Sequence, residues 1–127
     1  MKTTELVLDF LRKEGFAPEV DTDNGNLFFK FQMAGFLYVN NDEDKGFFQL
    51  LMPAIYDVTE DNRYAVLEAA NEINTKMKVA KANIIGDSVW LACEILLDET
   101  PNVEDIMPRL LGILQTARQE FYQEMQG

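Results

Sequence analysis

The stretch LFFKFQMAGFLYVN, residues Leu27–Asn40, decides the fold because its apolar residues follow the two-residue period of a β-strand. Its first half places alternate side chains on opposite faces of a strand, with Leu27, Phe29 and Phe31 on one face and Phe28, Lys30 and Gln32 on the other. We expect Met33-Ala34-Gly35 to turn the chain and Phe36–Asn40 to return beside the first strand. The stretch therefore predicts an antiparallel hairpin.

Further strands are predicted on both sides of this hairpin. Glu19–Asp21 has the length of a short strand and precedes a turn at Asp23–Asn26. An acidic turn over Asn41–Gly46 leads into Phe47–Met52, a fourth strand that we expect Pro53 to end, because proline has no N–H to donate to a sheet. Together these segments predict an antiparallel meander.

Apolar residues at helical spacing predict three helices, Thr4–Glu14, Asn62–Lys78 and Asn102–Met125. The apolar stripe of the second helix consists of Val66, Leu67, Ala70, Ile73 and Met77. Thr59 or Asp61 is expected to cap the start of this helix. Pro108 leaves two alternatives for the last helix: a kink after its first turn and a half, or a regular helix that begins nearer Asp105.

A second hairpin is predicted between the last two helices. Its strands are Val79–Ile85 and Ser88–Leu97, and Gly86-Asp87 forms the turn between them. The element order is therefore helix, meander, helix, hairpin, helix. This order predicts one α+β domain over residues 1–127, built on an antiparallel sheet.

The charge of the chain limits its partners. The 127 residues include 22 acids, 11 bases and no histidine, which gives a formal charge of −11. The bases are scattered, whereas binding to nucleic acid or to an anionic membrane surface requires clustered lysine and arginine. We therefore expect neither partner, and the acidity favours solubility and attraction of a basic partner.

Targeting signals are not recognisable in the sequence. No apolar run approaches the ~20 residues of a membrane span. The N-terminal stretch lacks the continuous apolar segment of a signal peptide. With a single cysteine, the chain is expected to be cytoplasmic.

The residues also offer little for catalysis or metal binding. Cys93 is in phase with apolar residues of its strand, so we expect it to be buried rather than reactive. The acidic segments Asp21–Gly25 and Asn40–Gly46 lack the ligand spacing of a calcium loop. The carboxylates lie mostly in turns and at helix starts, where solvation explains them. We expect no catalytic residue, no cofactor and no metal site, and an enzyme that works through carboxylates is the weaker alternative.

Several predicted strands carry apolar residues on both faces, as in Phe28 beside Phe29 and Leu37 beside Tyr38. Either three helices cover both faces of the sheet, or one face is an exposed apolar surface, which usually marks an interface. Strand phase shows which residues share a face but not which face is covered. The candidate residues for a dimer seam or a client groove are Phe28, Phe36, Tyr38, Phe48 and Trp90.

Asn71 and Asn74 share one face of the second predicted helix, because they are three residues apart. Asparagine is a mediocre helix former, so both positions need a reason. Their amides either satisfy backbone groups of a neighbouring strand or form polar contacts within a binding groove. Asn74 therefore joins the candidate interface residues.

Segments along nearly the whole chain fit one known pattern. They are the hairpin Leu27–Asn40, GFFQLLMP at 46–53, AANEIN at 69–74 leading through Lys78–Ala82 into a strand, the strand around Trp90–Glu94, and the helix end Glu120-Phe121-Tyr122. In these segments the chain resembles the YbjN-like family, bacterial proteins to which a regulatory role in sensory transduction is ascribed. That family has the fold of the type III secretion chaperones.

This resemblance implies a small acidic cytoplasmic protein that forms homodimers and binds protein segments without enzymatic chemistry. Secretion chaperones of this fold hold an extended client against hydrophobic patches, and that mode suits a sheet with two apolar faces. The family's sensory label implies the alternative function, a small-ligand sensor with a cavity between sheet and helices. Asn74 and Lys81 match the family's helix-to-strand junction.

Overall fold

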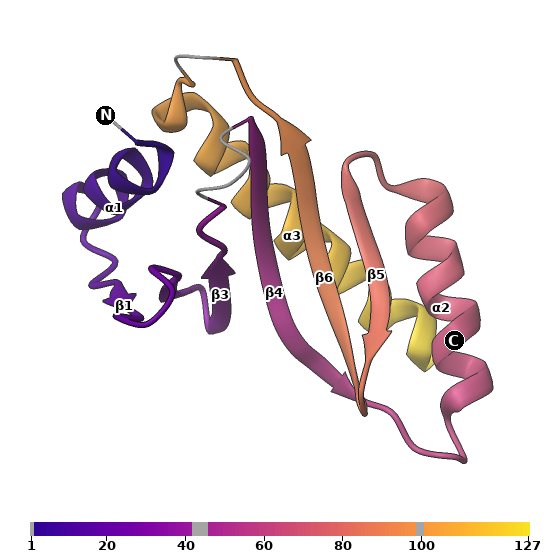
Figure 1. Cartoon of the computed structure of the whole chain (residues 1–127). Coiled ribbons are helices and arrows are strands. Elements are labelled where there is room, and N and C mark those ends of the chain that lie inside the picture. Colours follow the sequence, from indigo (N-terminus) through magenta and orange to yellow (C-terminus); the bar gives the residue numbers. More distant parts are fainter. Residues whose placement is uncertain (1, 42–45, 99–100) are drawn as a thin grey trace.

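The computed structural model describes residues 2–41, 46–98 and 101–127 and contains three helices and a six-stranded antiparallel sheet (Figure 1). The elements are α1 (Thr3–Lys13), β1 (Glu19–Val20), β2 (Leu27–Phe31), β3 (Ala34–Tyr38), β4 (Phe47–Asp57), α2 (Arg63–Lys76), β5 (Ala80–Ile85), β6 (Ser88–Leu96) and α3 (Val103–Gln126). The α+β class and the predicted order of elements are confirmed. Part of the predicted acidic turn, residues 42–45, lies outside the described residues.

The strand order across the sheet is β1-β2-β3-β4-β6-β5, so α2 and β5 follow β4 in sequence while β6 lies beside β4 in space. β4 and β6 form the long central ladder, from Phe47 paired with Leu96 to Asp57 paired with Ser88. The two edge strands differ in length: β1 has two residues and β5 has six.

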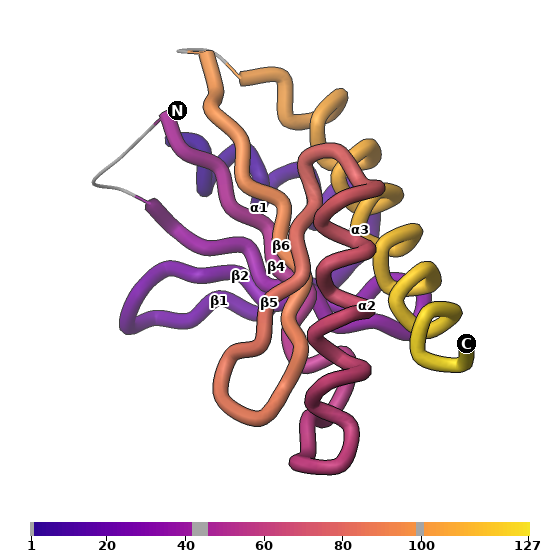
Figure 2. Tube along the Cα trace, turned by 90° about the vertical axis from the view of Figure 1, so that its right-hand side faces the viewer, coloured from indigo at the N-terminus to yellow at the C-terminus, as the bar shows by residue number. Residues whose placement is uncertain are grey.

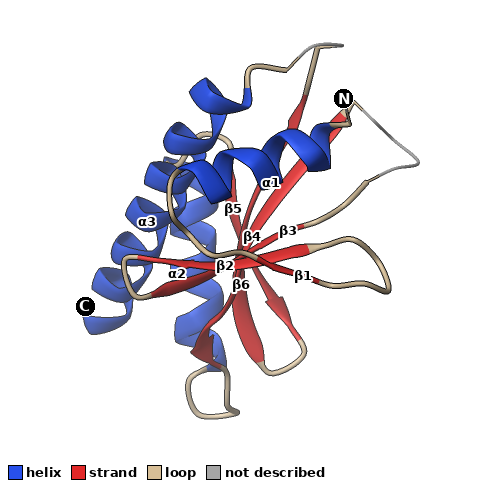
Figure 3. Ribbon diagram, turned by 90° about the vertical axis from the view of Figure 1, so that its left-hand side faces the viewer, coloured by secondary structure: helices blue, strands red, loops and turns tan. Residues whose placement is uncertain are grey.

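All three helices cover the same face of the sheet. α2 and α3 lie together on one side of β4, β6 and β5 (Figure 2). α1 lies close to β2 and β3 (Figure 3), and its Thr4 Oγ1 is 3.4 Å from the hydroxyl oxygen of Tyr38, which points from β3 toward this helix layer. Of the two arrangements that the sequence left open, the described part of the chain has helices on one face of the sheet and none on the other.

The core fills the space between the sheet and this helix layer. Phe29 and Phe36 stack with ring centroids 5.4 Å apart, and Tyr38 meets Phe48 edge-on at 5.2 Å. The helices contribute buried side chains such as Val7, Ile73 and Phe121. Burial of one large apolar side chain is worth about 1.5–3 kcal/mol, so this cluster supplies most of the driving force for folding.

The hairpin between β2 and β3 turns earlier than the sequence indicated. Gln32 and Met33 form the turn, both with positive φ (49° and 66°), and β3 already begins at Ala34. Such two-residue turns are normally signalled by Asn-Gly or Asp-Gly. The prediction of a turn at Met33-Ala34-Gly35 was wrong because glycine was taken as the turn residue, whereas Gly35 is a strand residue paired with Lys30.

Pro53 does not end the fourth strand, which continues to Asp57. The pairing of β4 with β6 shifts between Met52 and Tyr56, and Ala54 within this irregularity has a φ of 50°. On its other side, β4 pairs with β3 at Leu50 and Leu51, before Pro53 is reached. Proline is tolerated at such a bulge because no ladder hydrogen bond needs its nitrogen.

The starts of the last two helices also differ from expectation. Asn62, rather than Thr59 or Asp61, is the cap residue of α2, and it exchanges bonds with Thr59: Thr59 N–H donates to Asn62 Oδ1 (2.7 Å) and Asn62 N–H donates to Thr59 Oγ1 (3.2 Å). α3 begins at Val103 and runs through Pro108, which excludes a start nearer Asp105. Asn102 caps it by accepting from Asp105 N–H.

Candidate protein-binding face

The face of the sheet opposite the helices carries a row of apolar side chains in register. Phe28 pairs with Leu37, Leu37 with Leu51, and Leu51 with Ala92, so the row crosses β2, β3, β4 and β6. Trp90 lies two residues from Ala92 on the same face of β6. We call the surface formed by these five residues the open face.

Side chains of the open face are only partly covered. Phe28 keeps 36% of its surface exposed, and Leu37, Leu51 and Trp90 are half-buried. Ala92 is buried although it does not belong to the helix-side core, because the larger neighbours on its own face surround it. Contiguous apolar surface of this kind is typical of an interaction site.

Phe28 owes its position to Gly35. The two residues lie on the same face of adjacent strands, and a Cβ at Gly35 would be only 3.2 Å from Phe28 Cζ. The Phe28 ring therefore covers the glycine and lies close to the sheet surface. Glycine at this strand position is explained by this packing and not by a turn.

Beside the apolar row lies a polar cluster. Gln49 Nε2 donates to Glu94 Oε2 at 2.8 Å, and Lys81 forms an ion pair with Glu94. Gln49 and Glu94 are directly paired across β4 and β6. A partner on the open face would thus meet an apolar strip with a charged margin, the usual anatomy of a protein interface.

At its β1 end the open face deepens into an open groove of about 400 Å³. The groove is lined by Glu19, Val20, Asp21, Asn26, Phe28 and Leu37. Glu19 pairs with Phe28 across β1 and β2, so its carboxylate lies on the same face as the ring. Apolar walls and two carboxylates therefore share one concave surface.

The loop beside the groove is held by its own hydrogen bonds. Asp21 N–H donates to Asn26 O (2.9 Å), and Gly25 N–H donates to Asp21 O (2.7 Å). Asn40 N–H donates to Asn26 Oδ1 (2.9 Å), which fixes the loop to the chain beyond β3. A Cβ at Gly25 would be 2.6 Å from Asn40 Nδ2, and its φ is +79°, so this position requires glycine.

The structure divides the predicted interface residues into three groups. Phe28 and Trp90 lie on the open face, as an interface requires. Phe36, Tyr38 and Phe48 are buried in the core, with at most 1% exposed, so the prediction that they face a partner was wrong. They alternate with open-face residues along their strands, and only knowledge of which face the helices cover separates the two sets. Asn74 forms the third group.

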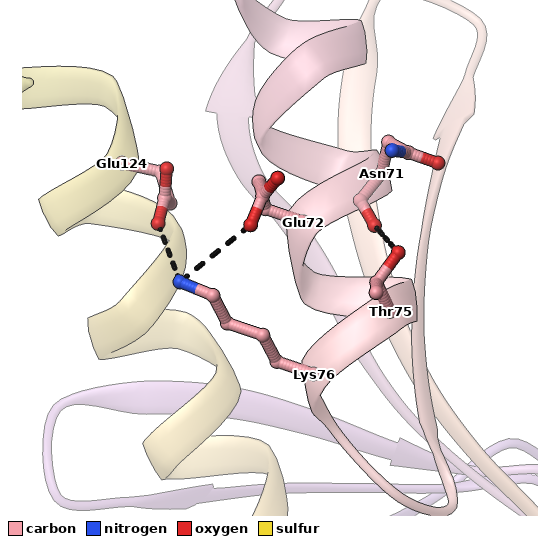
Figure 4. A network of polar contacts seen from close by, with 5 residues as sticks. All are labelled: Asn71, Glu72, Thr75, Lys76 and Glu124. Carbon is pink, nitrogen blue, oxygen red and sulfur yellow. Dashed lines mark hydrogen bonds and ion pairs between the residues drawn. The ribbon is translucent and has the colours of Figure 1, made fainter.

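The Asn74 side chain forms hydrogen bonds with β5, an edge strand of the sheet. Its Nδ2 donates to Ala82 O (3.0 Å), and its Oδ1 accepts from Ala82 N–H (2.7 Å). The amide therefore satisfies both backbone groups that Ala82 turns away from β6, as the first of the two interpretations of Asn74 predicts. Asn71 accepts at its backbone oxygen from Thr75 Oγ1 (2.8 Å), and its side chain points away from Lys76 (Figure 4).

Ion pairs join the helices of the covering layer. Lys76 Nζ is 2.9 Å from Glu124 Oε1 on α3 and 3.6 Å from Glu72 Oε2 on its own helix (Figure 4). The hydrogen bond to Glu124 raises the pKa of Lys76 above its ordinary value of 10.5. Lys13 pairs with Glu104 at 3.0 Å and joins α1 to α3. These exposed pairs orient helices and build no reactive site.

The described residues show little reactive chemistry. Cys93 is fully buried, as expected, and desolvation raises the pKa of its thiol to about 12, which disfavours the nucleophilic thiolate. Across residues 2–41, 46–98 and 101–127, no polar or charged residue is buried, and no three Asp, Glu or Cys residues are grouped to hold a metal ion. Within these ranges no helix has the length and apolarity needed to cross a bilayer.

The fold and the open face define a class: an α+β protein with an antiparallel sheet, one face covered by helices and the other available for contact. A similar solved structure is the crystal structure of YbjN from E. coli, a candidate transcription regulator, with a TM-score of 0.65. The similarity covers 94% of this chain and 88% of that one at 9% sequence identity, so this chain has a YbjN-like fold. No protein-family model matches the chain, and a search of curated proteins finds no relative.

Sequence reasoning missed Leu51 and the acidic pair Glu19 and Asp21 as possible contact residues. Leu51 is in phase with Phe47 and could have been found from strand alternation alone. The acidic pair could not, because its position beside Phe28 depends on the register of β1 against β2.

Proposed function

We propose that the protein is a non-enzymatic protein-binding module that regulates or chaperones a partner through its open face and acts as a homodimer. The observation that carries the proposal is the row Phe28, Leu37 and Leu51, which no helix of the described residues covers, with Trp90 nearby on the same face. Water contacts this apolar surface in the single chain, and its removal by a partner is favourable by about 25 cal/mol per Å².

The YbjN-like fold supports a regulatory role without direct contact to nucleic acid. A net charge of −11 repels phosphate, so regulation by this chain is expected to act through a protein partner. The buried thiol and the solvent-exposed carboxylates of the described residues add support for a binding role rather than catalysis.

The homodimer is supported by other exposed apolar side chains at the β5 edge. Tyr64 and Leu67, three residues apart on one side of α2, are 77% and 49% exposed, and Ile85 at the end of β5 is 53% exposed. Leu67 was predicted to lie in the apolar stripe of this helix, yet it faces outward. A second copy packed here would leave the open face free for a client.

A pair of matched leucine substitutions separates the two parts of the proposal. Leu37→Ser should weaken binding of apolar peptides at least tenfold and leave the dimer intact, while Leu67→Ser should do the reverse. Peptide binding is followed by fluorescence anisotropy and mass by light scattering, where the wild type is expected at twice the 14.6 kDa chain mass. A wild-type monomer would overturn the homodimer, and binding that survives Leu37→Ser would overturn the role of the open face.

A further inference from the structure

We infer that the groove at the β1 end of the open face takes a lysine or arginine side chain carried by an otherwise apolar segment of a partner protein. The inference rests on the proposed function, because it gives the chemistry of the segment that the open face binds. It commits to a basic partner rather than to a second copy of this chain.

The lining of the groove matches the two parts of a long basic side chain. Phe28 and Leu37 provide apolar surface, and Glu19 and Asp21 provide carboxylates on the same concave surface. Lysine and arginine place their methylene stems on apolar surface while the charged head stays at the water boundary. An acidic side chain would be repelled here, and a short apolar one would leave the carboxylates without a counter-charge.

The charged residues around the groove determine on which side a bound cation is favoured. Lys30 lies two residues beyond Phe28 on the same face of β2, so positive potential increases on that side. Glu19 and Asp21 lie on the opposite side of the ring, along β1 and just after it. A partner's cation is therefore favoured over the β1 side of the groove, and the apolar neighbours of that cation then lie along Leu37 and Leu51.

A second copy is a poor occupant of the same groove. Twofold packing over this end would bring another Glu19 and Asp21 toward the first pair, since both subunits use the same patch. Each chain also carries a formal charge of −11, and like charges oppose that approach. The same potential steers a basic segment toward the groove and raises its association rate.

The groove is also preorganised. The hydrogen bonds Asp21 N–H to Asn26 O and Gly25 N–H to Asp21 O fix the chain next to the two carboxylates. Asp21 Oδ1 additionally accepts from Asp23 N–H at 2.9 Å, which orients that carboxylate. Because the groove is already ordered, a ligand meets a small entropic penalty on binding.

Three fluorescent peptides test the inference. They share a short alternating apolar sequence and differ at one central position, which is lysine, acetyl-lysine or glutamate. Anisotropy with the wild type is expected to show about 3- to 10-fold tighter binding of the lysine peptide than of the acetyl-lysine peptide, the range for one or two exposed charge pairs. The preference should shrink at high salt, and the glutamate peptide should bind most weakly.

The variant Glu19→Gln with Asp21→Asn removes both charges and keeps the side-chain shapes, including the Oδ1 that accepts from Asp23 N–H. It should abolish the preference for lysine and keep binding of the acetyl-lysine peptide. The matched control is Glu60→Gln with Glu68→Gln, which changes the net charge equally. Glu68 is on α2 and Glu60 shortly before it, beside the other edge of the sheet, and this control should keep the preference.

The outcomes separate the groove inference from the proposed function on which it rests. Equal binding of lysine and acetyl-lysine peptides overturns the groove inference and leaves the open face as a general apolar binding site. A preference that survives Glu19→Gln with Asp21→Asn, or is lost in the control, overturns the groove as its source. Failure of the wild type to bind any of the three peptides overturns the proposed function of the open face itself.

Discussion

The two faces of the sheet are built from the same strands and nearly the same residue types, yet they differ in what covers them. On the helix side, Phe36 is fully buried, and one residue further along the strand Leu37 remains half-exposed. The helices of the chain cover the first face, whereas the second face is exposed to water. The comparison teaches that hydrophobic strand residues are not by themselves core residues, because the position of the helices decides their role.

The largest expected loss of stability comes from a substitution on the face of the sheet that the helices cover. Phe36→Ala should lower the free energy of unfolding by about 3–5 kcal/mol, since it removes a stacked ring from a closed core. Leu37→Ala on the neighbouring position should cost about 1 kcal/mol or less, because its side chain is already partly exposed to water. Urea unfolding of both variants measures the contrast, and equal losses would contradict the distinction between the faces.

The second prediction concerns the pH dependence of stability that Cys93, on the covered face, produces. The pKa of Cys93 is raised from 9.0 to about 12 by burial, so the folded state keeps the thiol protonated after the unfolded chain has lost its proton. The stability that this group contributes is complete below pH 9 and is lost as the pH rises toward 12, by at most about 1.4 kcal/mol per pH unit. Cys93→Ala lacks this dependence.

Urea unfolding at pH 8, 9 and 10 checks the thiol prediction. The stability difference between the wild type and Cys93→Ala should change by less than about 0.5 kcal/mol from pH 8 to 9, and by about 1 kcal/mol in favour of the variant from pH 9 to 10. Labelling with a thiol reagent should also be slow in buffer and fast in denaturant. Rapid labelling of the native protein at pH 8 would show that Cys93 is accessible.

A smaller effect concerns the sheet edge between the two faces. Asn74→Ala should destabilise the protein by about 1–3 kcal/mol, because it leaves both backbone groups of Ala82 without their side-chain partner. Asn71→Ala on the same helix is the control and should be close to neutral. Hydrogen exchange at the Ala82 amide should accelerate only in the first variant, and unchanged protection there would contradict the assignment.

The smallest effect sharpens the description of the open face. Gly35→Ala should displace the Phe28 ring, since the new Cβ would come within 3.2 Å of it, and the flexible ring can move away at a cost below about 1 kcal/mol. Peptide affinity should fall while the core spectrum by NMR stays unchanged. Gly112→Ala, at an exposed position of α3, has open space for a Cβ and serves as the control, with no loss of peptide binding.

The sequence predicted the positions of the helices and strands better than the turns and irregularities that connect them. Periodicity found each helix, and alternation assigned Leu27 and Phe29 to one face and Phe28 to the other, as the structure confirms. It failed at Gln32–Met33, where the turn lacks its usual residues, and at Pro53, where a bulge accommodates proline. The local sequence pattern does not show that Gln32–Met33 can form a turn or that a bulge can accommodate Pro53.

The candidate site was harder to predict for a related reason. Phe36 and Phe28 are equivalent in sequence, both aromatic and both in strands, and only the placement of the helices makes one core and the other surface. The acidic groove depends in addition on the pairing of Glu19 with Phe28, a long-range register. Residue types indicated apolar residues on both faces of the sheet, but which face stays exposed depends on where the helices pack.

The Asn74 amide has a consequence for assembly. By occupying the outward N–H and C=O of Ala82, it acts as a one-residue substitute for a seventh strand, while the opposite margin, Glu19–Val20, is too short to template one. Neither margin therefore invites strand-by-strand polymerisation. The apolar face of the sheet can therefore remain exposed to water without long unpaired strand edges beside it.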